Sequence, residues 1–100
     1  MLDEIYLHMK TIDEKVEMGK MMSCDGITYE GKVFCFEYKD KMVFKLGKDY
    51  DIESHGIKSY NFLNPFKKKG PMKAWFELNL DQNKHFLKLA QVALEVMKNA

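Results

Sequence analysis

Residues 32–46, KVFCFEYKDKMVFKL, decide the fold. Their side chains follow the period of two that is typical of β-strands. One face of the first strand is expected to carry Phe34, Phe36 and Tyr38, and the other Val33, Cys35 and Glu37. In the next strand Met42, Phe44 and Leu46 alternate with Val43 and Lys45. Both faces of the first strand are therefore apolar, and its sheet needs cover on both sides.

Turn residues divide the surrounding sequence into three antiparallel strands, predicted at 20–28, 32–38 and 41–46. Glu30-Gly31 is the better of the two turn signals, because glycine accepts the left-handed backbone of a two-residue hairpin. Lys39-Asp40 is the second turn. These turns predict a three-stranded meander at the centre of the chain.

The two cysteines are expected to stay reduced. Counting outward from the first turn pairs Thr28 with Val33 and Gly26 with Cys35. That register makes Cys24 a diagonal neighbour of Cys35 on the same face, about 7 to 8 Å away and beyond comfortable disulfide reach.

Amphipathic helices are predicted at the two ends of the sequence. The first has a stripe at helical spacing formed by Leu2, Ile5, Met9, Ile12 and Val16, and Gly19 is its expected stop. The second, capped near Asn79 or Asp81, has a stripe formed by Phe86, Leu89, Ala90, Ala93, Leu94 and Met97.

The region between the meander and the last helix is mixed. A short helix is predicted at 48–55, with a cap, an inward side chain and a left-handed terminator at Asp49, Ile52 and Gly56. Residues 57–71 are expected to be mostly loop, with a short strand at 60–63 left open. A final strand should carry Met72, Ala74, Phe76 and Leu78 on one face, and Lys73, Trp75 and Glu77 on the other.

The order of these elements predicts one domain over residues 1–100 with an α+β fold. It is a two-layer sandwich, in which an antiparallel sheet of four or five strands is covered on one face by the N- and C-terminal helices. The implied order is α-β-β-β-α-(β)-β-α, in which the bracketed strand is the short one left open at 60–63.

Charge and composition exclude several classes of function. Sixteen Lys and Arg against fifteen Asp and Glu leave a net charge of +1, too little to draw the whole molecule to nucleic acid or anionic lipid. All sixteen cations are lysine, so the planar fork that reads guanine edges is absent. The first ten residues lack the basic start of a signal peptide and no apolar run is long enough for a membrane span, which predicts a cytoplasmic protein.

No catalytic, cofactor or metal site is predicted. The histidines, His8, His55 and His85, fall in three separate elements, and no nucleophile elbow or phosphate-binding glycine loop occurs. The sequence therefore predicts a protein that is not an enzyme.

A resemblance to a known family is carried by residues 21–34, Lys41–Leu46, His55-Gly56, Phe66, and Pro71-Met72 leading through Trp75-Phe76-Glu77 into the last helix. These stretches resemble the N-terminal domain of TfoX/Sxy-type competence regulators. The chain departs from the family at Met21-Met22-Ser23-Cys24, where members usually have Met-Phe-Gly-Gly. The resemblance implies a fold like that of type III secretion chaperones, shared with the related YjbR group, and a role in competence or transcription regulation beside other transcription factors.

Two hypotheses for function lead, and an enzyme with a shallow site is the third. The first is a small protein-binding module that uses its sheet face or a sheet edge, with a homodimer as one way to cover the apolar strand. The alternative is a nucleic-acid accessory domain working through residues 58–73, where lysines lie among stacking aromatics. The candidate surface consists of Lys58, Tyr60, Lys67, Lys68, Lys69, Lys73 and Trp75.

Overall fold

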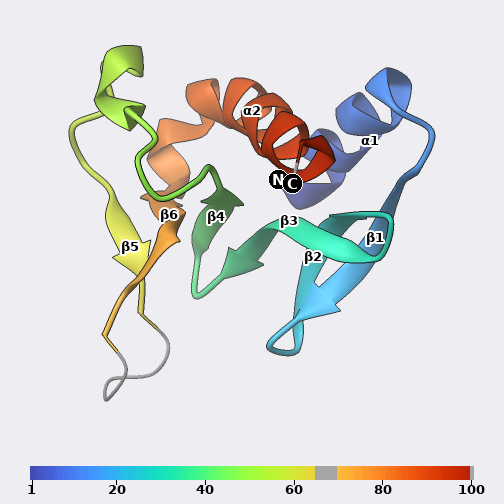
Figure 1. The fold of residues 1–100 in the computed structure, drawn as a ribbon, viewed down its shortest axis with the longest axis horizontal. Coiled ribbons are helices and arrows are strands. Elements are labelled where there is room, and N and C mark those ends of the chain that lie inside the picture. Colours follow the sequence, from blue (N-terminus) through green and yellow to red (C-terminus); the bar gives the residue numbers. More distant parts are fainter. Residues whose placement is uncertain (65–69, 100) are drawn as a thin grey trace.

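The computed structural model describes residues 1–64 and 70–99 and has an α+β fold with two layers (Figure 1). Within these residues, six antiparallel strands form one sheet in the order β1-β2-β3-β4-β6-β5. The strands are β1 Val16–Met21, β2 Cys24–Tyr29, β3 Lys32–Tyr38, β4 Lys41–Lys45, β5 Asn61–Leu63 and β6 Met72–Asn79. The helices α1 (Leu2–Ile12) and α2 (Phe86–Lys98) lie together on one side of the sheet. The predicted fold class is confirmed.

The start of the sheet differs from the prediction of one strand at 20–28. Residues 16–29 form a hairpin of β1 and β2, and the turn between them is Met22-Ser23, with φ of 52° and 66°. Two left-handed residues in succession are typical of a type I′ turn, which usually contains asparagine or glycine. The turn lacks this signal, so the first strand is missed and the sheet has more strands than the four or five expected.

The first helix is correspondingly shorter than predicted. It ends at Ile12, and Asp13 already has an extended backbone with φ of −148°. Val16 therefore belongs to β1, although its spacing continues the helical stripe. Gly19 does not stop a helix, because it lies within β1 opposite Gly26. A Cβ added at Gly19 would be 2.5 Å from the Thr28 methyl group.

A bulge in β3 changes which side chains share a face. Ile27 pairs with Cys35 but the adjacent Thr28 pairs with Val33, so Phe34 is an extra residue in the ladder. Phe34 and Cys35 consequently both join the core beneath the helices, and Phe36 faces the other way. The prediction that Phe34 and Phe36 share a face is wrong, because a bulge interrupts the period of two.

The same register shift separates the cysteines. Cys35 is in the core beneath the helices, and Cys24 packs against the opposite face. The expectation that they share a face is therefore wrong. Both thiols are free, with the sheet between them.

Strand β6 has a second irregularity. Phe62 of β5 pairs with Phe76, but Leu63 pairs with Met72, and the Ala74 carbonyl accepts the backbone N–H groups of residues 46 and 47. Met72 and Ala74 thus pack beside Trp75 instead of beside Phe76, contrary to the simple alternation. The short strand left open at 60–63 is present as β5.

The sheet has a core on each face. The helix-side core takes side chains from both helices and from β1, β2, β3, β4 and β6. Among them are Ile5, Met9, Phe34, Phe44, Phe76, Phe86 and Leu94. The second core consists of Phe36, Val43, Leu63 and Trp75. Its members are fully buried except Trp75, which is 7% exposed. The second face is therefore already covered within a single chain.

Two polar contacts tie α2 to α1 and to the residue that follows α1. His8 Nε2 lies 3.0 Å from Gln91 Nε2, and Lys98 forms an ion pair of 3.2 Å with Asp13. All six residues of the predicted α2 stripe are buried, so this prediction is confirmed. The helix begins at Phe86, after a 3-10 segment (Leu80–His85) whose N-cap is Asn79.

The short helix expected at 48–55 is a single 3-10 turn, Ile52–His55. Ile52 is buried, and Gly56 has φ of 80°, so the inward residue and the terminator are confirmed. The N-cap position is Asp51, and neither it nor Asp49 makes a side-chain capping bond.

Candidate functional site

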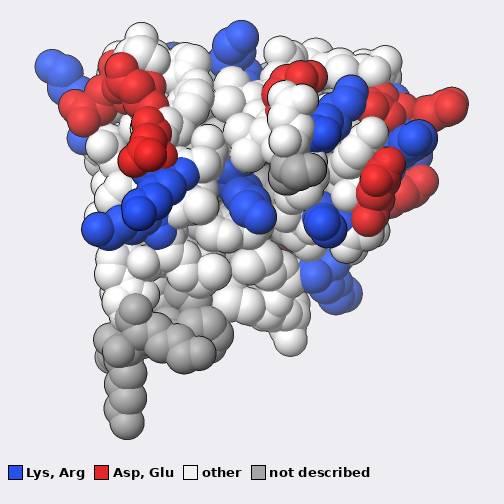
Figure 2. Space-filling model, in the orientation of Figure 1, with Lys and Arg blue, Asp and Glu red and all other residues white. Residues whose placement is uncertain are grey.

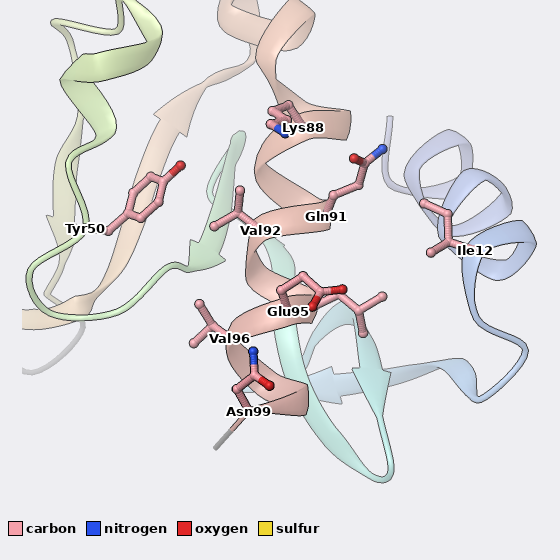
Figure 3. Close-up of a pocket in the computed structure, with 9 residues that line it drawn as sticks. Ile12, Tyr50, Lys88, Gln91, Val92, Glu95, Val96 and Asn99 are labelled. Carbon is pink, nitrogen blue, oxygen red and sulfur yellow. The ribbon is translucent and has the colours of Figure 1, made fainter.

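An open trough of about 590 Å³ lies above α2. Figure 3 shows α2 between Tyr50 on one side and Ile12 on the other. The lining residues are Ile12, Tyr50, Lys88, Gln91, Val92, Leu94, Glu95, Val96 and Asn99. Helix α2 is therefore the floor, and two other elements supply the walls.

The wall at Tyr50 is held by contacts within its own loop. The Tyr50 hydroxyl is hydrogen-bonded to Nε2 of His55 at 2.5 Å, and the two rings stack with their centroids 5.8 Å apart. The same ring meets the edge of Phe76 at 6.5 Å, which ties the wall to the helix-side core. Burial, and after it the charge of Asp51, raises the pKa of Tyr50, so its hydroxyl stays protonated at neutral pH.

The opposite wall is the last residue of α1. Ile12 is 48% exposed, a large value for an isoleucine that ends an amphipathic helix. The contact between His8 and Gln91 fixes α1 beside α2 one turn earlier. The exposed Ile12 side chain therefore stands at a defined position beside the trough.

The floor of the trough is a stripe on the solvent side of α2. Lys88, Val92, Glu95 and Asn99 follow one another at steps of four, three and four residues. Such steps place side chains along one face of a helix. None of the ion pairs among the described residues includes Lys88 or Glu95. The stripe thus offers an apolar centre between one cation and one anion.

The trough has the size of a ligand site. Its volume falls within the range of about 300 to 1,000 Å³ that is usual for ligand sites. The reactive side chains of the described residues are dispersed: no group of three or more His, Cys, Asp or Glu could hold a metal there. His55 is engaged by Tyr50, and His8 by Gln91. The trough therefore presents shape, apolar surface and two separated charges.

The structure does not bring the aromatic residues of the candidate surface at 58–73 together. Tyr60 packs toward the helix-side core, where its hydroxyl donates to Glu53 over 3.2 Å. Trp75 belongs to the second core on the other face, with Lys45 Nζ 5.7 Å from its ring centroid. Lys58 and Lys73 are exposed, and residues 67–69 lie outside the described residues.

On the face that Figure 2 shows, lysines and acidic side chains of the described residues are interspersed. The near-neutral balance of the whole chain agrees with this mixture. Neither observation favours a phosphate backbone as the ligand.

Sequence reasoning missed the trough, because its residues come from three segments that are distant along the chain. Val92 and Val96 were the available signal: they are apolar residues of α2 that lie outside its buried stripe. Nothing in the sequence indicates that Tyr50 and Ile12 stand on either side of them.

Comparison with known proteins returned nothing: the chain matches no family model, no curated protein and no solved structure. The resemblance to the TfoX-type domain stays a prediction. Among the described residues, no helix has the length and apolar character needed to cross a membrane.

Proposed function

We propose that this protein is a non-catalytic protein-binding module whose binding site is the trough above α2. The observation that carries the proposal is the trough itself, with apolar side chains at its centre and at both walls. Helix faces of this kind accept an apolar segment of another protein, whose side chains fill the groove. The site replaces the sheet face of the original hypothesis, because the second core buries that face within one chain.

The open edge of β1 is a weaker candidate for the same role. Nζ of Lys10 occupies the start of that edge, where it donates to the carbonyl oxygens of Glu14 and Val16 over 2.7 and 2.8 Å. Charged residues on the strand, Glu17 and Lys20, are also typical of edges protected against pairing. The trough carries no comparable protection.

The resemblance to TfoX-type regulators supports a protein partner, since those regulators act together with other transcription factors. A role in competence or transcription rests on that resemblance alone. The nucleic-acid alternative has less support, because Tyr60 and Trp75 face opposite sides of the sheet.

Site-specific photocrosslinking in cells tests the proposal. A photoreactive residue at Val92, in the trough, is compared with one at Lys20, which is exposed on β1. We expect protein adducts at position 92 that are absent at position 20. The protein identified in the adduct, once purified, should shift the amide resonances of α2. Equal labelling at both positions, or no shift in α2, would contradict the proposal.

A further inference from the structure

The exposed stripe of α2 has a charge order that is complementary to itself. Lys88 lies near the start of the helix and Glu95 lies seven residues later, on the same face. At 1.5 Å of rise per residue, the two positions are about 10 Å apart along the axis. Val92 lies between them. The stripe therefore reads cation, apolar residue, anion.

A two-fold axis through the middle of this stripe would match each charge with its opposite. In an antiparallel pair of α2 helices, Lys88 of each copy faces Glu95 of the other, and the Val92 side chains meet at the centre. A symmetric interface requires such reciprocity, because the same patch serves both copies. A parallel pair would instead place lysine beside lysine and glutamate beside glutamate, which is unfavourable. The charge order thus selects one orientation.

The walls of the trough fit the same arrangement. Ile12 and Tyr50 flank α2 on either side (Figure 3). Under this two-fold axis each flank faces the same flank of the other copy, so Ile12 lies opposite Ile12 and Tyr50 opposite Tyr50, with apolar surface on both sides of the paired stripes. Half-buried Val96 adds apolar surface one turn beyond Val92. A contact of this kind has an apolar centre and a polar rim, as stable interfaces do.

We propose that the occupant of the trough is a second copy of this chain, and that the homodimer forms by antiparallel pairing of the two α2 helices. This inference rests on the proposed function, because it names the partner of the same site. Its contacts come from one 13-residue helix and two flanking side chains, which belongs to the small end of interface sizes. The dimer should consequently dissociate on dilution.

Charge reversal and mixing test the pairing. Lys88→Glu places two glutamates opposite each other at both ends of the interface, and Glu95→Lys does the same with lysines. By sedimentation at low salt, each variant should raise the dimer dissociation constant about tenfold, since two favourable surface pairs are lost and two unfavourable pairs replace them. Equal amounts of the two variants, mixed, should restore a dimer that contains one copy of each. Both residues are exposed, so we expect each variant to keep the fold.

Disulfide trapping tests the orientation in a Cys24→Ser background. Lys88→Cys and Glu95→Cys should cross-link to each other when mixed, and far less to themselves. A dimer that ignores both charge reversals, or that cross-links 88 to 88, would overturn the inference.

The outcomes also separate this inference from the proposed function. A chain that is monomeric at high concentration, yet gives adducts to a different protein at position 92, overturns the homodimer and leaves the binding module standing. A monomer without adducts overturns both.

Discussion

Replacement of Phe36 by alanine should remove a large part of the stability of this protein. The Phe36 side chain is fully buried in the second core. Its ring meets Trp75 edge-on, with centroids 5.5 Å apart at 69°, and Tyr38 at 6.1 Å and 63°. Buried Phe→Ala substitutions typically cost about 3 to 5 kcal/mol, because the transfer free energy is lost and a cavity remains.

That cost is large relative to the whole. A chain of this length has a free energy of unfolding of about 5 to 15 kcal/mol. The loss at Phe36 therefore amounts to about a fifth of the total or more, and Phe36→Ala should lower the urea midpoint strongly. Phe36→Leu keeps most of the volume and should cost less.

A natural tryptophan provides the fluorescence assay. Trp75 is the only tryptophan of the chain and stands against the Phe36 ring. Its fluorescence reports the second core, and far-ultraviolet circular dichroism reports the whole fold. Urea unfolding is followed by both signals at a protein concentration where the wild type is monomeric. Under that condition the second core is buried only by residues of its own chain.

The matched control is Leu7→Ala. Leu7 is also a large apolar residue, but it is 65% exposed on α1, and its loss should change the free energy of unfolding by less than about 0.5 kcal/mol. The reasoning is refuted if Phe36→Ala costs less than about 1 kcal/mol and leaves the Trp75 emission unchanged. The second face would then be open surface rather than core.

Three other outcomes are expected. Gly26→Ala should cost about 1 to 3 kcal/mol in urea unfolding, because its Cβ would lie 2.9 Å from the Cys35 carbonyl oxygen; a wild-type midpoint would argue against this close packing. Thiol reagents should modify native protein only at Cys24, since burial raises the pKa of the Cys35 thiol; rapid labelling of two thiols per chain would contradict this. The backbone N–H of Lys15 and the Lys98 ammonium hold the pKa of Asp13 below its ordinary 3.8. Its carboxylate stabilises the fold fully above that value and loses the effect as pH falls below it, so Asp13→Asn should flatten the acid side of the stability profile; an unchanged profile would show that the contacts of Asp13 do not matter.

Local patterns predict most elements of this fold, and fail where the backbone departs from regular geometry. The α2 stripe is predicted residue by residue, because burial of a helix follows its own period of 3.6. The first hairpin is missed because its Met22-Ser23 turn adopts left-handed angles without asparagine or glycine. The face of Phe34 is wrong because a bulge, set by pairing with β2, shifts the alternation by one residue.

The candidate site was less accessible to sequence reasoning than the fold. The predicted surface at 58–73 relied on proximity along the chain, but Tyr60 lies just before β5 and Trp75 lies on β6, and pairing between these segments sets which face each side chain takes. Tyr60 and Trp75 accordingly belong to different cores. The trough, by contrast, joins Ile12, Tyr50 and α2, which only the folded chain places together.

The sequence by itself determined the fold class and the buried side of the last helix, because these depend on the spacing of apolar residues within short segments. Tertiary structure alone decided the register of β3, the closure of the second core and the walls of the trough. The physical reason is that each of these depends on pairing and packing between distant segments, whose relative positions no local period encodes.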